Sequence, residues 1–109
     1  MELYIDSADT LAIHDLVNVL PVNGVTTNPS LVAKSGVELT KLISELRTIL
    51  GEEKLIFAQV LAKDTPTIIR EAQYLHELCA NMVVKIPVDR AGLAAITQLK
   101  QRNLSLIHI

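Results

Sequence analysis

The sequence lacks the features that mark several large classes of protein. Its 109 residues include 10 basic and 12 acidic side chains, for a formal net charge of -2 at pH 7. This balance provides no positive patch for nucleic acid or for an anionic membrane surface. The uncharged apolar stretches are far too short to span a bilayer, although 50% of the residues are hydrophobic. We therefore expect neither a nucleic-acid partner nor a membrane partner.

Cysteine is nearly absent too. The single cysteine, Cys79, lies at an apolar position of a predicted helix. At such a position a buried structural thiol is more usual than a reactive one. The first residues lack a basic segment followed by a long apolar one, so we expect no secretory signal. Both observations fit a reducing cytoplasm.

Motifs for metal and phosphate binding are missing as well. The three histidines, His14, His76 and His108, have no paired spacing typical of a metal site. No glycine-rich phosphate loop of the Gly-x-x-x-x-Gly-Lys type is present. We therefore interpret the histidines as solvated or incidental side chains.

Short apolar strands alternate with amphipathic helices along the chain, which is the signature of a parallel α/β protein. The predicted strands are residues 3–5, 24–25, 55–61 and 82–86. Apolar residues recur three or four positions apart between them, which predicts helices. The predicted buried faces carry Ile13, Leu16, Val17 and Leu20; Leu39, Leu42, Ile43, Leu46 and Leu50; Ile68, Ala72, Leu75 and Cys79; and Leu93, Ile96 and Leu99. Thr65-Pro66 is expected to cap and open the third helix.

Lys85 interrupts the apolar run 82–88, which otherwise has the pattern of one buried strand. The charge of an ammonium is costly to bury, so a lysine in an apolar site loses its proton more readily and can act as a Schiff-base nucleophile. Considered alone, a lysine at a strand end more often lays its methylenes on apolar neighbours and sends its ammonium to water. The residues that share its side of the sheet decide between these interpretations.

Strand alternation places several polar side chains on the same side as Lys85. Asp6 and Gln59 lie near the carboxyl ends of their strands, opposite the aliphatic-rich face, and Thr26 and Asn28 follow the second strand. In a closed (β/α)8 barrel, active sites are assembled at the carboxyl-end rim. The alternatives are that Asp6 only caps the first helix, for which Ser7 and Asp9 are also plausible caps, and that Thr26 and Asn28 only form a turn.

Four motifs, in the same order, resemble the transaldolase family, and in particular its small members typified by fructose-6-phosphate aldolase. They are Leu3-Tyr4-Ile5-Asp6, Gly24-Val25-Thr26-Thr27-Asn28-Pro29-Ser30, Phe57-Ala58-Gln59-Val60 and Val83-Val84-Lys85-Ile86-Pro87-Val88, and Gly92-Leu93-Ala94-Ala95-Ile96 extends the match. The resemblance implies a (β/α)8 TIM barrel of the class I aldolase type. It also implies small sugar or sugar-phosphate substrates, no metal or other cofactor, a cytoplasmic enzyme, and homo-oligomers such as pentamers or decamers.

The resemblance also assigns roles to the rim residues. Lys85 corresponds to the Schiff-base lysine, and Asp6 to the carboxylate that positions substrate hydroxyls and assists proton movement. Thr26 and Asn28 correspond to substrate-binding residues, with Asn28 bonded to a donor hydroxyl near the Schiff base. Gln59 stands where the transaldolase branch usually carries glutamate and the aldolase branch carries glutamine. Glutamine would orient a catalytic water without exchanging protons itself.

Gln59 therefore favours a Schiff-base aldolase that cleaves fructose 6-phosphate to dihydroxyacetone and glyceraldehyde 3-phosphate. One alternative is a transaldolase that moves a dihydroxyacetone unit between sugar phosphates in the pentose phosphate pathway. The other is a non-catalytic half-barrel that serves as a binding or assembly module. No dedicated motif supports this second alternative.

The last six residues, Leu104-Ser105-Leu106-Ile107-His108-Ile109, differ from the stretch resembling Pro-Thr-Leu-Gly-Thr-Ala with which the family continues. They are the translation of CTG-TCT-CTT-ATA-CAC-ATC, which resembles the transposon-end adapter used in DNA library preparation. A complete barrel also needs at least about 200 residues. We therefore expect residues 1–103 to be the N-terminal half of a barrel, about four β/α units, and residues 104–109 to be a non-native tail. We expect this truncated polypeptide to have little activity alone.

Overall fold

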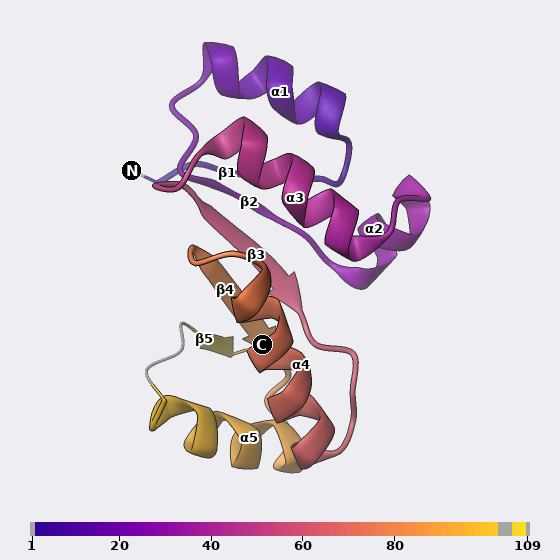
Figure 1. Ribbon diagram of the computed structural model, residues 1–109, viewed down its shortest axis with the longest axis vertical. Coiled ribbons are helices and arrows are strands. Elements are labelled where there is room, and N and C mark those ends of the chain that lie inside the picture. The colour runs from indigo at the N-terminus through magenta and orange to yellow at the C-terminus, as the bar shows by residue number, and fades with distance from the viewer. Residues whose placement is uncertain (1, 103–105, 109) are drawn as a thin grey trace.

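Parallel strands alternate with helices throughout the computed structural model, which describes residues 2–102 and 106–108 (Figure 1). The elements, in chain order, are β1 (Tyr4–Asp6), α1 (Thr10–Val19), β2 (Gly24–Thr26), α2 (Pro29–Ser35), α3 (Leu39–Leu50), β3 (Leu55–Gln59), α4 (Thr65–Leu78), β4 (Met82–Ile86), α5 (Arg90–Lys100) and β5 (Leu106–His108). The strands form one sheet in the order β1-β2-β3-β4-β5, and every neighbouring pair is parallel. The predicted alternation is therefore confirmed.

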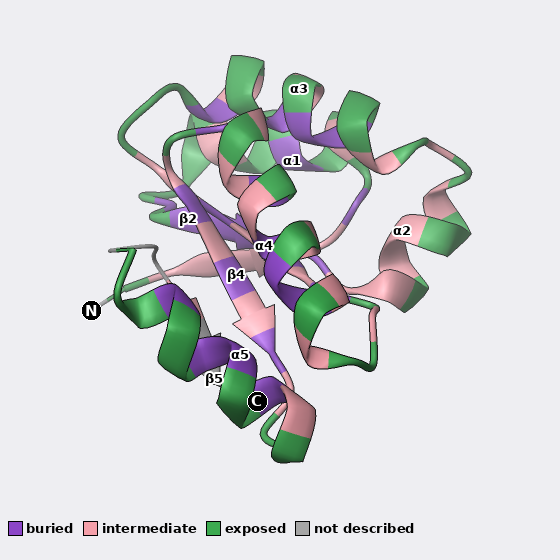
Figure 2. Cartoon of the chain, turned by 60° about the horizontal axis from the view of Figure 1, so that its bottom comes forward, coloured by how far each residue is buried: buried purple, intermediate pink, exposed green. Residues whose placement is uncertain are grey.

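The hydrophobic core lies on one face of the sheet, because alternate side chains of each strand point to the same side. The strand residues buried on this face are Val25, Ile56, Ala58, Met82, Val84 and Ile86. Buried side chains of α1, α3, α4 and α5 join them in one cluster. Figure 2 shows the resulting alternation of buried and half-buried residues along β4. In Figure 1, α1 and α3 lie side by side, and so do α4 and α5.

On the opposite face no strand side chain of the described chain is fully buried. This face carries Tyr4, Asp6, Thr26, Leu55, Phe57, Gln59, Val83 and Lys85, which are half-buried except for the exposed Asp6. We call this the inner face. As predicted, the aliphatic-rich side of the strands meets the helices, and Asp6, Gln59 and Lys85 lie on the other side.

The second predicted helical region is divided into two helices. Gly36 adopts a left-handed conformation with φ of 70° and ends α2. Glycine has no Cβ, so it tolerates this conformation at little cost. The chain then enters α3, which buries Leu42, Ile43, Leu46 and Leu50 as its apolar pattern predicts.

Two helices bury only part of the predicted set of residues. In α1, Ile13 is buried and Val17 is half-buried against the core, whereas Leu16 and the C-cap residue Leu20 are exposed. In α5, Leu93 is 48% exposed, and the buried stripe runs through Gly92, Ala95, Ile96 and Leu99. Ile96 and Leu99 are therefore buried as predicted, and the small residues Gly92 and Ala95 take the remaining buried positions in place of Leu93.

The helix caps also differ in part from the prediction. Of the candidate caps for α1, Asp9 takes that role, and its carboxylate accepts a hydrogen bond from the Ala12 amide at 3.2 Å. In α4 the cap is Asp64, because its carboxylate accepts from the Thr67 amide at 3.0 Å, whereas Thr65 is already the first helical residue. The hydrogen bonds from Thr67 hold the pKa of the Asp64 carboxyl below its usual value.

The β5 strand was not predicted. It pairs with β4 in parallel and lies within the residues for which we expected a non-native tail. Residues 104, 105 and 109 of that tail lie outside the described residues, as does residue 103 before it, and the origin of the tail stays a prediction. Among the described helices, none is long and apolar enough to cross a membrane.

The start of α5 packs closely against the chain that leaves β4. Asp89 caps the helix and accepts a hydrogen bond from the Gly92 amide at 2.7 Å. A Cβ added at Gly92 would stand 1.9 Å from the carbonyl oxygen of Pro87. Only glycine therefore fits at this contact, which lies just beyond the strand that carries Lys85.

We expect Gly92→Ala to lower the free energy of unfolding by about 1–3 kcal/mol, because the added methyl group overlaps backbone that cannot move aside cheaply. Helix propensity alone predicts the opposite effect, because it favours alanine over glycine by about 1 kcal/mol. Thermal unfolding at one fixed chain concentration measures the change, with Ala94→Ser at an exposed position of α5 as the control. A Gly92→Ala variant as stable as the parent chain would contradict the expected overlap.

Candidate functional site at the carboxyl ends of the strands

The sheet register brings four of the five predicted site residues into two adjacent rows on the inner face. Asp6 is the register partner of Thr26, and Thr26 is the partner of Phe57. Gln59 is the partner of Lys85 one row nearer the carboxyl ends of the strands. The fifth residue, Asn28, lies outside these rows, two positions beyond the end of β2.

Asp6 and Thr26 are joined directly. The Thr26 hydroxyl donates a hydrogen bond to Asp6 Oδ1 at 2.9 Å. Asp9 caps α1, whereas the carboxylate of Asp6 is bonded to Thr26 of the neighbouring strand. Its oxygens are acceptors for hydroxyl groups, and a carboxylate at this place can also exchange a proton with a ligand.

Asn28 caps a helix and is also a candidate site residue. Its side-chain oxygen accepts a hydrogen bond from the Leu31 amide at 3.0 Å, which caps α2. Pro29 follows in the first turn, where its missing N–H costs nothing. The cap uses the amide oxygen, so the Nδ2 group is the part of Asn28 that can donate to a substrate hydroxyl.

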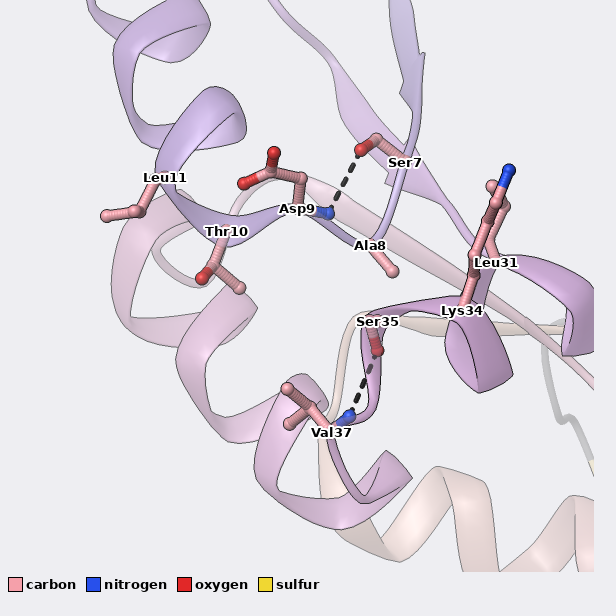
Figure 3. A pocket seen from close by; sticks show the side chains of 9 residues that line it. All are labelled: Ser7, Ala8, Asp9, Thr10, Leu11, Leu31, Lys34, Ser35 and Val37. Atoms are coloured by element: carbon pink, nitrogen blue, oxygen red, sulfur yellow. Dashed lines mark hydrogen bonds between the residues drawn. The ribbon is translucent and has the colours of Figure 1, made fainter.

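A cavity of about 240 Å³ adjoins both Asn28 and Gln59. The rest of its lining is largely apolar and comprises Thr27, Pro29, Val32, Ala33, Leu39, Ala58 and Leu61. A larger cavity, of about 420 Å³, lies between the turn after β1 and α2 (Figure 3). The larger cavity contains none of the five predicted residues, so we assign the candidate site to the inner-face rim.

Lys85 lies between neighbouring strands at this rim. Gln59 flanks it on β3, and Ile107 is its register partner on β5. The Lys85 side chain is half-buried, and within the described part of the chain it forms no ion pair. A primary amine so placed is a nucleophile for a carbonyl carbon when it is neutral.

Two aromatic residues lie among the inner-face rows and were not singled out from the sequence. The rings of Tyr4 and Phe57 meet edge to face, with centroids 5.4 Å apart and planes at 84°. Desolvation, and then the hydrogen bond to the Glu2 carboxylate at 3.2 Å, raises the pKa of Tyr4. The signal that would have found them is strand parity, because Tyr4 shares a side with Asp6, and Phe57 with Gln59.

Cys79 lies at the other end of β4 from Lys85. It ends α4, and its thiol donates to Asn81 Oδ1 at 2.9 Å. Burial raises the pKa of the Cys79 thiol, which disfavours the reactive thiolate. The described residues include no group of three or more histidine, cysteine, aspartate or glutamate side chains that could hold a metal ion.

A family model described as Transaldolase/Fructose-6-phosphate aldolase matches residues 3–107. The chain belongs to this family. The parallel strands and their helices accordingly form part of a (β/α)8 barrel, as the resemblance implied. The transaldolase/aldolase family is a family of enzymes, and its members act on sugar phosphates. The match overlaps the first four positions of the predicted tail, residues 104–107.

Proposed function

We propose that the chain carries the Schiff-base centre of a fructose-6-phosphate aldolase, with Lys85 as the nucleophile. The observation that carries this proposal is the arrangement at the rim, where Gln59 is the register partner of Lys85 and Asp6 is hydrogen-bonded to Thr26 in the adjacent row. Family membership supports chemistry of this general type. The choice of aldolysis over transfer rests on glutamine at position 59.

In the proposed reaction the neutral Lys85 amine attacks the ketose carbonyl carbon, and loss of water gives an iminium ion. The iminium draws in the electrons of the bond between the α and β carbons. That bond breaks, the hydroxyl proton of the departing aldehyde passes to Asp6, and glyceraldehyde 3-phosphate leaves. The remaining enamine of dihydroxyacetone is protonated at carbon, and a water molecule oriented by Gln59 then hydrolyses the iminium and regenerates Lys85.

Thr26 and Asn28 complete the proposal as substrate-binding residues. Asn28 donates from Nδ2 to a donor hydroxyl, and Thr26 contacts substrate while it also holds Asp6. We further propose a cytoplasmic location and a homo-oligomer of the pentamer or decamer type, by analogy with the family. No metal or other cofactor is needed for the steps described, because the iminium itself is the electron sink.

Borohydride reduction in the presence of dihydroxyacetone is expected to attach the ketose irreversibly to Lys85, because reduction converts the Schiff base to a stable amine. The adduct accumulates, so even slow formation is detected by peptide mass spectrometry. Lys85→Ala should abolish the label, whereas Lys100→Ala on the exposed face of α5 should retain it. Equal labelling of Lys85→Ala and the parent chain, or label spread over exposed lysines, would contradict the assignment of Lys85 as the nucleophile.

Free cleavage should exceed transfer. We expect release of glyceraldehyde 3-phosphate from fructose 6-phosphate to proceed without an acceptor, because Gln59 directs water to the intermediate. Addition of erythrose 4-phosphate should then leave the rate of release unchanged. A rate that depends on erythrose 4-phosphate would instead identify a transaldolase.

A polypeptide of these 109 residues alone is expected to associate with itself and to turn over slowly. One side of β1 and one side of β5 are unpaired in the described sheet, and open strand edges promote association. The half-buried inner face also leaves water close to Lys85. Sedimentation velocity and a coupled aldolase assay measure both properties, and a cooperatively unfolding monomer with ordinary turnover would contradict the expectation.

A further inference from the structure

A carboxylate from α4 holds the turn that follows Gln59. Oε2 of Glu71 accepts hydrogen bonds from two successive backbone amides, Leu61 at 3.1 Å and Ala62 at 2.7 Å. Oε1 of the same carboxylate lies 3.4 Å from the Leu61 amide. Hydrogen bonds to an ionised carboxylate are roughly twice as strong as those between neutral groups. The β3–α4 turn is therefore fixed to the helix by one side chain.

The residue between Gln59 and this pair of amides is bound to the neighbouring strand. The Val60 amide donates to the carbonyl oxygen of Lys85 at 3.2 Å, and Gln59 is the register partner of Lys85. The three residues after Gln59 thus donate their amides to β4 and to Glu71. The direction in which the chain leaves Gln59 is set by both attachments.

The same turn borders the cavity that adjoins two of the site residues, Asn28 and Gln59. Leu61 lines the 240 Å³ cavity together with Gln59 and Asn28, and its side chain is 62% exposed. Val60 before it is buried in the core and Ala62 after it packs against the core, so Leu61 is the exposed residue of this stretch. Glu71 is itself half-buried on α4, so it offers a rigid support for this turn.

We propose that Glu71 is a positioning residue for the Gln59–Lys85 pair. Its carboxylate holds the β3–α4 turn, and through Val60 it fixes the place from which Gln59 directs water to the intermediate on Lys85. Glu71 itself contacts no substrate. The catalytic part of this inference rests on the proposed function, since it takes Lys85 as the Schiff-base residue.

Two substitutions at Glu71 separate hydrogen-bond acceptance from packing. Glu71→Met removes the acceptor and keeps a side chain of similar length. Glu71→Gln retains one amide oxygen, which can occupy the place of Oε2 and accept from both amides. Glu77→Met is the matched control, because Glu77 is an exposed residue of the same helix.

Amide hydrogen exchange of the 109-residue chain tests the holding role without reference to activity. In Glu71→Met, exchange at Val60, Leu61 and Ala62 should rise by about tenfold or more, while amides of β2 keep their protection as the internal reference. Glu71→Gln and Glu77→Met should resemble the parent chain. Unchanged protection of Val60 in Glu71→Met would overturn the inference whatever the chain catalyses.

Decay of the Schiff base tests the catalytic consequence. The chain is loaded with dihydroxyacetone and diluted, and the adduct still reducible by borohydride is followed with time. Decay per adduct in Glu71→Met should be about ten- to a hundredfold slower, because misplaced catalytic groups cost rates of this order. Glu71→Gln should restore it.

The outcomes of the two measurements are distinct. A purely structural role of Glu71 would reduce the amount of adduct but not its decay rate, and that result would overturn the inference. If the parent chain forms no adduct at Lys85, the proposed function fails. The exchange data then decide the holding role of Glu71 by themselves.

Discussion

The alternation of side chains along parallel strands is the constraint on which the rest of this structure depends. Helices cover one face of the sheet, so the side chains that each strand buries in the core lie on that face, and the alternate side chains lie on the other. A shift of one residue in β4 would bury Lys85 in the core and expose Val84 and Ile86. The burial of Ile56, Ala58, Val84 and Ile86 therefore determines where Gln59 and Lys85 point.

Local hydrogen bonds at the carboxyl ends of the strands orient the side chains of this rim. Asn28 caps α2 with its oxygen and keeps its nitrogen for a ligand, and Thr26 donates to Asp6. Glu71 reaches back from α4 to the turn after β3. Parallel sheets place a loop directly after each strand, so residues that stabilise these loops also decide how the site residues are oriented.

The sequence predicted the first four strands, their two faces and most of the helices, because periodicity is a local property. It also predicted which polar residues share the rim, since parity and position at a strand end are readable along the chain. It was less successful with α1 and α5. Leu16 and Leu93 fit the apolar patterns of their helices but are exposed, because burial depends on which neighbours a helix meets. The cap of α4 was misplaced by one residue, since Asp64 competes with Thr65 for the same role.

By itself, the sequence determined the fold family and the candidate site residues, because family motifs and strand alternation are written in residue order. Only the tertiary structure decided how those residues are paired. The Thr26 to Asp6 bond, the Gln59 and Lys85 register and the Glu71 contacts join residues from different elements. The register of the strands and the contacts between side chains of different elements form only when the strands and helices pack together. No local pattern in the chain therefore specifies them.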